Sequence, residues 1–152
     1  MLYIQLSKNF RSEEFECKCC GKCEMDQRLI DVLQLIRDIL NKPIYINSGY
    51  RCDKHNKEVG GSSNSQHTKG KAADIRIKDM SVKQMYEMVK CFPTITGIGI
   101  YPEQNFIHVD VRDKPSTWVY IKSKRKYITV DEFEKLLESD HLLRYDYTTI
   151  RP

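Results

Sequence analysis

The chain has 152 residues, of which 40% are hydrophobic and 30% are charged, and its formal net charge at pH 7 is +4. This length and composition are ordinary for a soluble globular protein, so we expect a single domain over residues 1–152. No apolar run is long enough to cross a bilayer, so we expect no membrane segment.

The N-terminal part of the chain is unusually rich in cysteine. It starts with MLYIQLSKNFRSEEF, which lacks the basic and then apolar layout of a signal peptide, so we expect a protein made in the cytoplasm. The six cysteines are four in the run CKCCGKC and two that stand apart: Cys17, Cys19, Cys20, Cys23, Cys52 and Cys91. Clustered cysteines without an export signal suggest metal before disulfides, yet structural zinc sites normally combine two separated ligand pairs. A second metal site, a disulfide and reduced thiols therefore stay open as alternatives.

The first half of the chain predicts one long helix followed by shorter elements. Apolar residues at helical spacing predict a helix over 26–40, with Asp26 as its N-cap. The alternating run 43–48 predicts a strand, and 53–59 predicts a short helix ended by two glycines. Residues 62–66 are predicted to form a loop.

The second half predicts strands that alternate with helices. We expect strands over 73–77, 94–101 and 106–112, the last two forming an antiparallel pair joined by the turn PEQN. Capping boxes indicate helices over 81–91 and 129–137. These elements predict an α+β fold in which helices pack on a small antiparallel sheet.

Two separated runs contain the residues with the clearest chemistry. In the first run His67 precedes Asp74 by seven residues, with Gly70 between them. In the later run FIHVDVR, His108 and Asp110 share one face of the predicted strand, because residues two apart on a strand point the same way. Two histidines and a carboxylate are good zinc ligands, and a catalytic zinc site keeps three protein ligands and one open position.

These runs resemble the M15 family of zinc D-alanyl-D-alanine peptidases, in particular its small single-domain branch from bacteria and phages. The resemblance extends to the sites of the LAS enzymes and the hedgehog signalling domain, and it covers about residues 10–112, leaving 113–152 as a C-terminal extension. The matching positions are Ser48, Gly49, Tyr50, Arg51, Asn56, Val59, Gly60, Gly61, Ser65, His67, Gly70, Ala73, Asp74, Gly99, Tyr101, His108, Asp110 and Arg112.

The resemblance implies a zinc peptidase that hydrolyses peptidoglycan stem peptides, as a carboxypeptidase or an endopeptidase. Zinc is expected on His67, Asp74 and His108. Arg51 is expected to bind substrate or stabilise the oxyanion, since a guanidinium stays charged and offers a planar set of donors. Ser65 is expected to support the ligand loop and to contact substrate.

The general base is the least determined part of this site. Many relatives carry a carboxylate a few residues before the last histidine ligand, where this chain has Asn105 and Phe106. The candidates are Asp110, which shares a face with His108, and Glu103 in the PEQN turn. We favour Asp110 as the base, with the alternative that it only orients a metal ligand.

Two other functions are weighed against the peptidase. One is a non-catalytic zinc-containing module that binds cell wall or forms part of a phage particle. The other is a cysteine-rich protein that binds nucleic acid through the basic run KSKRK over 122–126, but it leaves the run from Gly49 to Asp74 unexplained, so we expect no nucleic-acid partner. A peptidase made without an export signal would reach the wall after lysis or in a phage particle.

The C-terminal extension is rich in aromatic residues. They are Trp118, Tyr120, Tyr127, Tyr145 and Tyr147. A segment of this kind can stack on sugar rings, but packing back on the core is more common, and we expect the latter. His55 and His141 are predicted to be surface residues. The sequence does not determine the oligomeric state.

Overall fold

The fold combines five helices with one six-stranded sheet in the computed structural model, which describes residues 3–121, 124–127 and 129–139. The helices are α1 (Ser12–Phe15), α2 (Gln27–Leu40), α3 (Asp53–Glu58), α4 (Val82–Val89) and α5 (Val130–Ser139), with a 3-10 turn η1 (Gln66–Lys69). The strands are β1 (Ile44–Ser48), β2 (Ala72–Ile77), β3 (Gly97–Tyr101), β4 (Phe106–Asp110), β5 (Ser116–Ile121) and β6 (Lys124–Tyr127). The predicted α+β class is confirmed.

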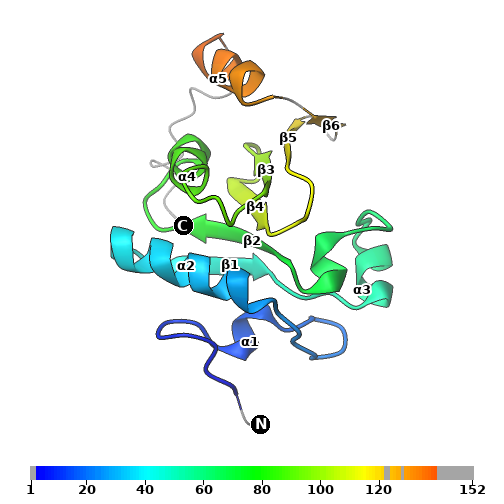
Figure 1. The fold of residues 1–152 in the computed structure, drawn as a ribbon. Coiled ribbons are helices and arrows are strands. Elements are labelled where there is room, and N and C mark those ends of the chain that lie inside the picture. Colours follow the sequence, from blue (N-terminus) through cyan, green and yellow to red (C-terminus); the bar gives the residue numbers. More distant parts are fainter. Residues whose placement is uncertain (1–2, 122–123, 128, 140–152) are drawn as a thin grey trace.

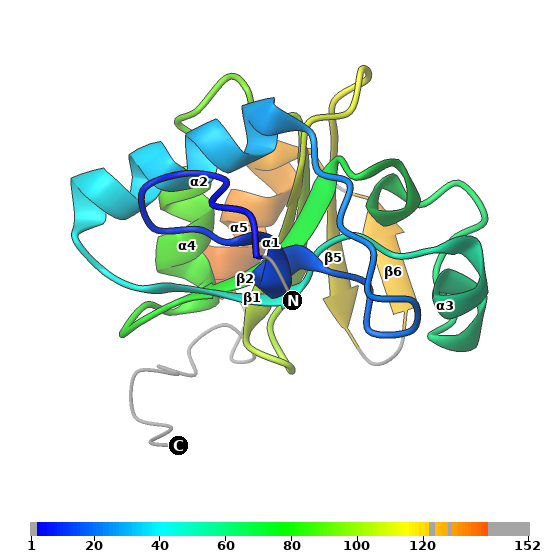
Figure 2. The ribbon, with the colours of Figure 1, turned by 90° about the horizontal axis from the view of Figure 1, so that it is seen from below.

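One face of the sheet packs against the core, and the opposite face carries the predicted site residues. Its strand order is β1-β2-β4-β3-β5-β6, and the pairs between described strands are antiparallel except for β3 with β5. Helices α2, α4 and α5 lie along one face of the sheet, whereas α3 lies on the other side (Figures 1 and 2). Strand alternation sends the apolar residues of β2 and β4, such as Ile75 and Val109, into the core under these helices. The residues between them face the opposite side.

Local signals in the sequence explain where the long helix begins and ends. The Asp26 carboxylate accepts a hydrogen bond from the Arg28 backbone N–H at 3.0 Å, which caps the N-terminus of α2. At the other end Asn41 adopts a left-handed conformation with φ of 49°, and its N–H bonds to the Arg37 carbonyl. The buried face of α2 consists of Leu29, Ile30, Val32, Leu33 and Ile36. The predicted helix and its caps are therefore confirmed.

The C-terminal extension contributes to the sheet itself. Strand β5 adds to the edge of β3 in parallel, with Gly99 opposite Trp118, and β6 then pairs with β5. Trp118 is buried and Phe133 of α5 joins the core, so this described part packs on the domain as expected. Of the basic run, residues 124–126 lie in β6 and residues 122–123 lie outside the described part. Residues Tyr145, Tyr147 and His141 lie outside it as well. No described helix is long and apolar enough to cross a membrane.

Candidate metal centre

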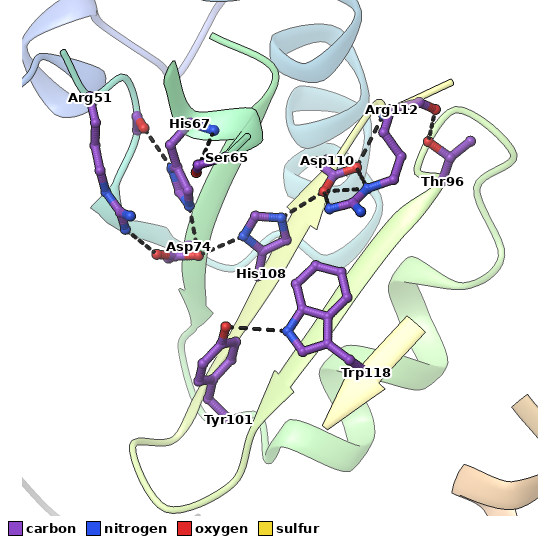
Figure 3. Close-up of polar contacts among 11 residues, drawn as sticks. Arg51, Ser65, His67, Asp74, Thr96, Tyr101, His108, Asp110, Arg112 and Trp118 are labelled. Carbon is purple, nitrogen blue, oxygen red and sulfur yellow. Dashed lines mark hydrogen bonds and ion pairs between the residues drawn. The ribbon is translucent and has the colours of Figure 1, made fainter. Parts of the chain in front are cut away.

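The three predicted metal ligands come together on the side of the sheet that faces away from α2 and α4. Asp74 of β2 lies directly opposite His108 of β4 in the antiparallel register. His67 enters from η1, and its Nε2 lies 3.3 Å from the nearer oxygen of Asp74, Oδ1. His108 Nδ1 lies 3.1 Å from the same oxygen (Figure 3). One donor atom from each residue therefore lies within 4.8 Å of the other two.

The outer contacts of the two histidines fix which nitrogen of each faces the centre. His67 Nδ1 lies 2.7 Å from the Gly49 carbonyl, which only accepts, so this nitrogen carries a proton and Nε2 faces Asp74. His108 Nε2 lies 2.7 Å from Asp110 Oδ2, so it donates there and Nδ1 faces Asp74. Both rings thus have the outward hydrogen bond that orients metal-ligating histidines. Two ring nitrogens and one carboxylate oxygen that converge in this way form a donor set that suits zinc.

The electrostatics of the centre favour ionised Asp74 and neutral His67. Burial raises the pKa of Asp74, but the charges and hydrogen bonds of His67 and His108 outweigh it and hold that pKa well below its ordinary value. Burial lowers the pKa of His67, which keeps its ring neutral. Burial also disfavours charge on His108, yet its bonds to Asp110 and Asp74 raise its pKa above the ordinary value.

The turn that carries His67 is anchored at both ends. Ser65 caps η1, since its Oγ accepts a hydrogen bond from the His67 N–H at 3.3 Å. At the other end Gly70 has a φ of 68° and packs so closely on the Glu24 carbonyl that a Cβ would overlap it. The Asp26 N–H donates to the Gly70 carbonyl at 2.8 Å. Ser65 also lines the cleft, but its contact with substrate stays a prediction.

Arg51 contacts the metal-ligand set directly. Its Nη2 donates to Asp74 Oδ2 at 3.1 Å, and its Nε donates to Ser48 Oγ at 3.0 Å. The guanidinium therefore holds the second oxygen of Asp74 while Oδ1 faces the histidines. The side chain is 16% exposed and lines the cleft, and its contact with a substrate stays a prediction.

Asp110 lies behind His108 and away from the cleft. It is 0% exposed, and its Oδ2 accepts hydrogen bonds from His108 Nε2 at 2.7 Å and Arg112 Nη2 at 2.6 Å. Its Oδ1 accepts from the Arg112 backbone N–H at 3.1 Å. Gly97 lies opposite in β3, and a Cβ there would overlap the Asp110 carboxylate. Burial raises the pKa of Asp110, but His108 and Arg112 outweigh this effect and lower it well below its usual range.

An aromatic wall closes one side of the centre. The Trp118 ring lies 5.0 Å from the His108 ring and 5.0 Å from the Arg112 guanidinium carbon, and its Nε1 donates to the Tyr101 hydroxyl at 3.3 Å. A Cβ at Gly99 would overlap Trp118, so glycine at this position makes room for the indole. Sequence reasoning gave no site role to Arg112 or Trp118. Arg112 lies two residues after Asp110, just beyond the end of β4, and this spacing was the available signal.

The centre lies at the bottom of a cleft of about 360 Å³. Its lining consists of Arg51, Val59, Gly60, Gly61, Ser62, Asn64, Ser65, Gln66, His67, Asp74, Tyr101, Gln104, Phe106, His108, Arg112, Trp118, Tyr120 and Tyr127. Within the described part of the chain, Asp74 is the only carboxylate of this lining. Glu103 lies in the exposed turn between β3 and β4, and it is its neighbour Gln104 that lines the cleft. The structure thus brings Arg51 and the three ligands together, but neither candidate base faces the cleft.

Comparison with known proteins gives a family match that includes Arg51 and the three candidate metal ligands. The model of the family described as Peptidase M15 matches residues 8–110. The peptidoglycan L,D-endopeptidase MepK of Escherichia coli (strain K12) is 32% identical over 93 residues, which are 57% of this chain and 50% of MepK. The MepK of Shigella flexneri gives the same values, and the probable peptidoglycan L,D-endopeptidase MepK of Haemophilus influenzae is 36% identical over 75 residues, 46% of this chain and 40% of that relative. The chain spans about half the length of the curated relatives it matches.

Proposed function

The chain belongs to the peptidase M15 family, and on this basis we propose that it is a zinc-dependent endopeptidase that cleaves peptidoglycan peptides. The observation that carries the proposal is the convergence of His67 Nε2, Asp74 Oδ1 and His108 Nδ1 at the bottom of an open cleft. Three protein donors with space on the fourth side are the arrangement of a catalytic rather than a structural zinc site.

The donor set fits zinc because each ligand has a partner that holds it in the binding orientation. The Gly49 carbonyl, the Arg51 guanidinium and the Asp110 carboxylate hold His67, Asp74 and His108 respectively. Zinc in such a site supplies Lewis acidity for amide hydrolysis. The other contributions to catalysis come from the chain itself.

The cleft is suited to an anionic peptide. Arg51 and Arg112 both line it, and the described lining contains no carboxylate besides the metal ligand Asp74. Free carboxylates of a stem peptide would find guanidinium donors here, whereas a cationic peptide would be disfavoured. The names of the relatives support peptidoglycan as the substrate and endopeptidase over carboxypeptidase as the type of cleavage. Arrival at the wall after lysis or in a phage particle stays a prediction.

The structure favours a positioning role for Asp110. A base must reach the attacking water, but Asp110 is fully buried behind His108, and the described hydrogen bonds of its carboxylate are with His108 and Arg112. We propose that Asp110 holds the His108 ring so that Nδ1 faces the metal. Glu103 then becomes the stronger candidate for proton transfer, because its turn borders the cleft through Gln104.

The proposal is tested with the full chain on purified cell walls. Peptidoglycan digested by the protein should release fragments with new internal peptide ends, identified by mass spectrometry, and dialysis against a chelator should stop the reaction until zinc is restored. His67→Ala should lose one zinc ion and all cleavage activity. His55→Gln, outside the cleft, should retain the wild-type zinc content and cleavage activity. Cleavage by metal-free protein would refute the metallopeptidase. Release of single terminal residues would indicate a carboxypeptidase instead, and a zinc-loaded protein that leaves walls intact would support the non-catalytic module.

A further inference from the structure

A second group of metal-type donors lies in the N-terminal part of the structure. The Sγ atoms of Cys17, Cys20 and Cys52 all lie within 4.8 Å of one another, and no described disulfide joins them. We propose that these three thiolates hold a second, structural zinc ion, and that this ion ties the N-terminal segment to the loop that carries Arg51. The inference does not depend on peptidase activity.

The spacing of the sulfur atoms matches a zinc site better than a disulfide. Cys17 Sγ and Cys52 Sγ are 3.7 Å apart. Four thiolates at about 2.3 Å from a tetrahedral zinc lie about 3.8 Å from each other. The two sulfurs of a disulfide are about 2.05 Å apart, so Cys17 and Cys52 are not joined in this arrangement. Their separation is close to the one expected for two ligands of the same zinc ion.

The backbone around the cluster has the form of a metal-binding turn. Cys17 and Cys20 have the C-x-x-C spacing of zinc knuckles. The turn is closed by hydrogen bonds from the Cys17 N–H to the Lys22 carbonyl at 2.7 Å and from the Gly21 N–H to the Cys17 carbonyl at 2.8 Å. Gly21 has a φ of 70°, which favours glycine at this position. The chain thus returns on itself and places both thiols toward Cys52.

Backbone N–H groups point at the sulfur atoms, as expected for thiolates. The Cys52 N–H donates to Cys17 Sγ at 3.4 Å, and the His55 N–H donates to Cys52 Sγ at 3.4 Å.

Cys19 is exposed and precedes Cys20 in the chain, but it does not belong to the three-thiol group. Cys23 and Cys91 do not belong to the three-thiol group. Cys91 follows α4 and is exposed, so it serves as a matched control.

The second zinc would brace the first site through a short stretch of chain. The Tyr50 N–H donates to the Phe15 carbonyl at 2.8 Å, and a Cβ on Gly49 would lie 2.7 Å from the Phe15 Cα, so the two segments touch along their backbones. Cys17 and Cys52 lie just beyond this contact on each segment. The loop between these two contacts contains Arg51 and the Gly49 carbonyl that orients His67.

The test is the zinc content and cobalt spectrum of the full chain. Wild type and Cys91→Ser should bind two zinc ions, whereas Cys17→Ser and His67→Ala should each bind one. Cobalt-loaded His67→Ala should show a thiolate-to-cobalt charge-transfer band in the near ultraviolet, and Cys17→Ser should lack it. This band is independent of activity, so it separates failure of this inference from failure of the peptidase.

Two results would overturn the second site. One is a disulfide between cysteines of the cluster, shown by an intact mass lower by two hydrogens together with peptide mapping of the joined pair. The other is a native wild-type protein with one zinc whose cluster thiols all react with a thiol reagent. If Cys17→Ser does not fold, the cobalt band of His67→Ala still decides the question, because its absence there excludes thiolate ligation.

Discussion

Replacement of Asp110 by Asn separates orientation of a ligand from proton transfer. Asparagine has nearly the same shape but no charge, so it weakens the contacts to His108 Nε2 at 2.7 Å and Arg112 Nη2 at 2.6 Å without leaving a cavity. Loss of such an outer partner typically weakens metal binding by about ten- to a hundredfold, which is about 1.4–2.7 kcal/mol. We therefore expect the zinc Kd to rise by this factor while cleavage at saturating zinc stays near the wild-type rate.

The assay measures cleavage of cell-wall peptides against free zinc set by a metal buffer. Asp113→Asn, an exposed acid three residues further along, is the matched control and should change neither quantity. Glu103→Gln tests the other candidate base and should lower the rate with no change in zinc Kd. If Asp110→Asn binds zinc as tightly as wild type but loses turnover at full occupancy, Asp110 is the base and the positioning role is wrong.

Three further predictions follow from contacts around the same centre. Gly97→Ala should weaken zinc binding and lower the Tm, because the new Cβ overlaps the Asp110 carboxylate. A zinc Kd and a Tm equal to those of the wild type would contradict this packing. Acidification should weaken zinc binding by up to about tenfold per pH unit below the raised pKa of His108, because zinc must displace one proton from this ring. Calorimetric zinc titrations at several pH values measure this dependence. A zinc affinity that does not change with pH would contradict the protonation of His108. Arg51→Ala should keep the fold but weaken zinc binding, because it removes the partner of Asp74 Oδ2. At saturating zinc it should still lose about 3 kcal/mol of transition-state stabilisation in kcat/KM, with Arg51→Lys in between. Full activity at saturating zinc would show that the guanidinium does not meet the substrate.

The parts of the fold that local patterns control were predictable from the sequence. The helix α2 has the apolar spacing and both caps within its own sequence, and the Ser81–Gln84 capping box at the start of α4 is present as expected. The strand alternation of FIHVDVR placed His108 and Asp110 on one face, and the hydrogen bond between them confirms it.

The parts that depend on distant pairing were not predictable. The parallel addition of β5 to β3 follows from an unpaired backbone edge, and no pattern within residues 116–121 specifies which edge they join. The shared face of His108 and Asp110 also does not reveal that Gly97 admits the carboxylate or that Arg112 holds it there. These contacts turn Asp110 away from the cleft, and only the tertiary structure shows them.

The parallel β3–β5 pair has a consequence for where this domain can be cut. The matched family region ends at residue 110, before β5 begins at Ser116. A chain shortened to that region would leave the N–H and C=O groups of β3 along Ile98 to Ile100 without their partners on β5. Such a bare apolar edge pairs readily with another copy, so the shortened protein should aggregate even with every metal ligand present.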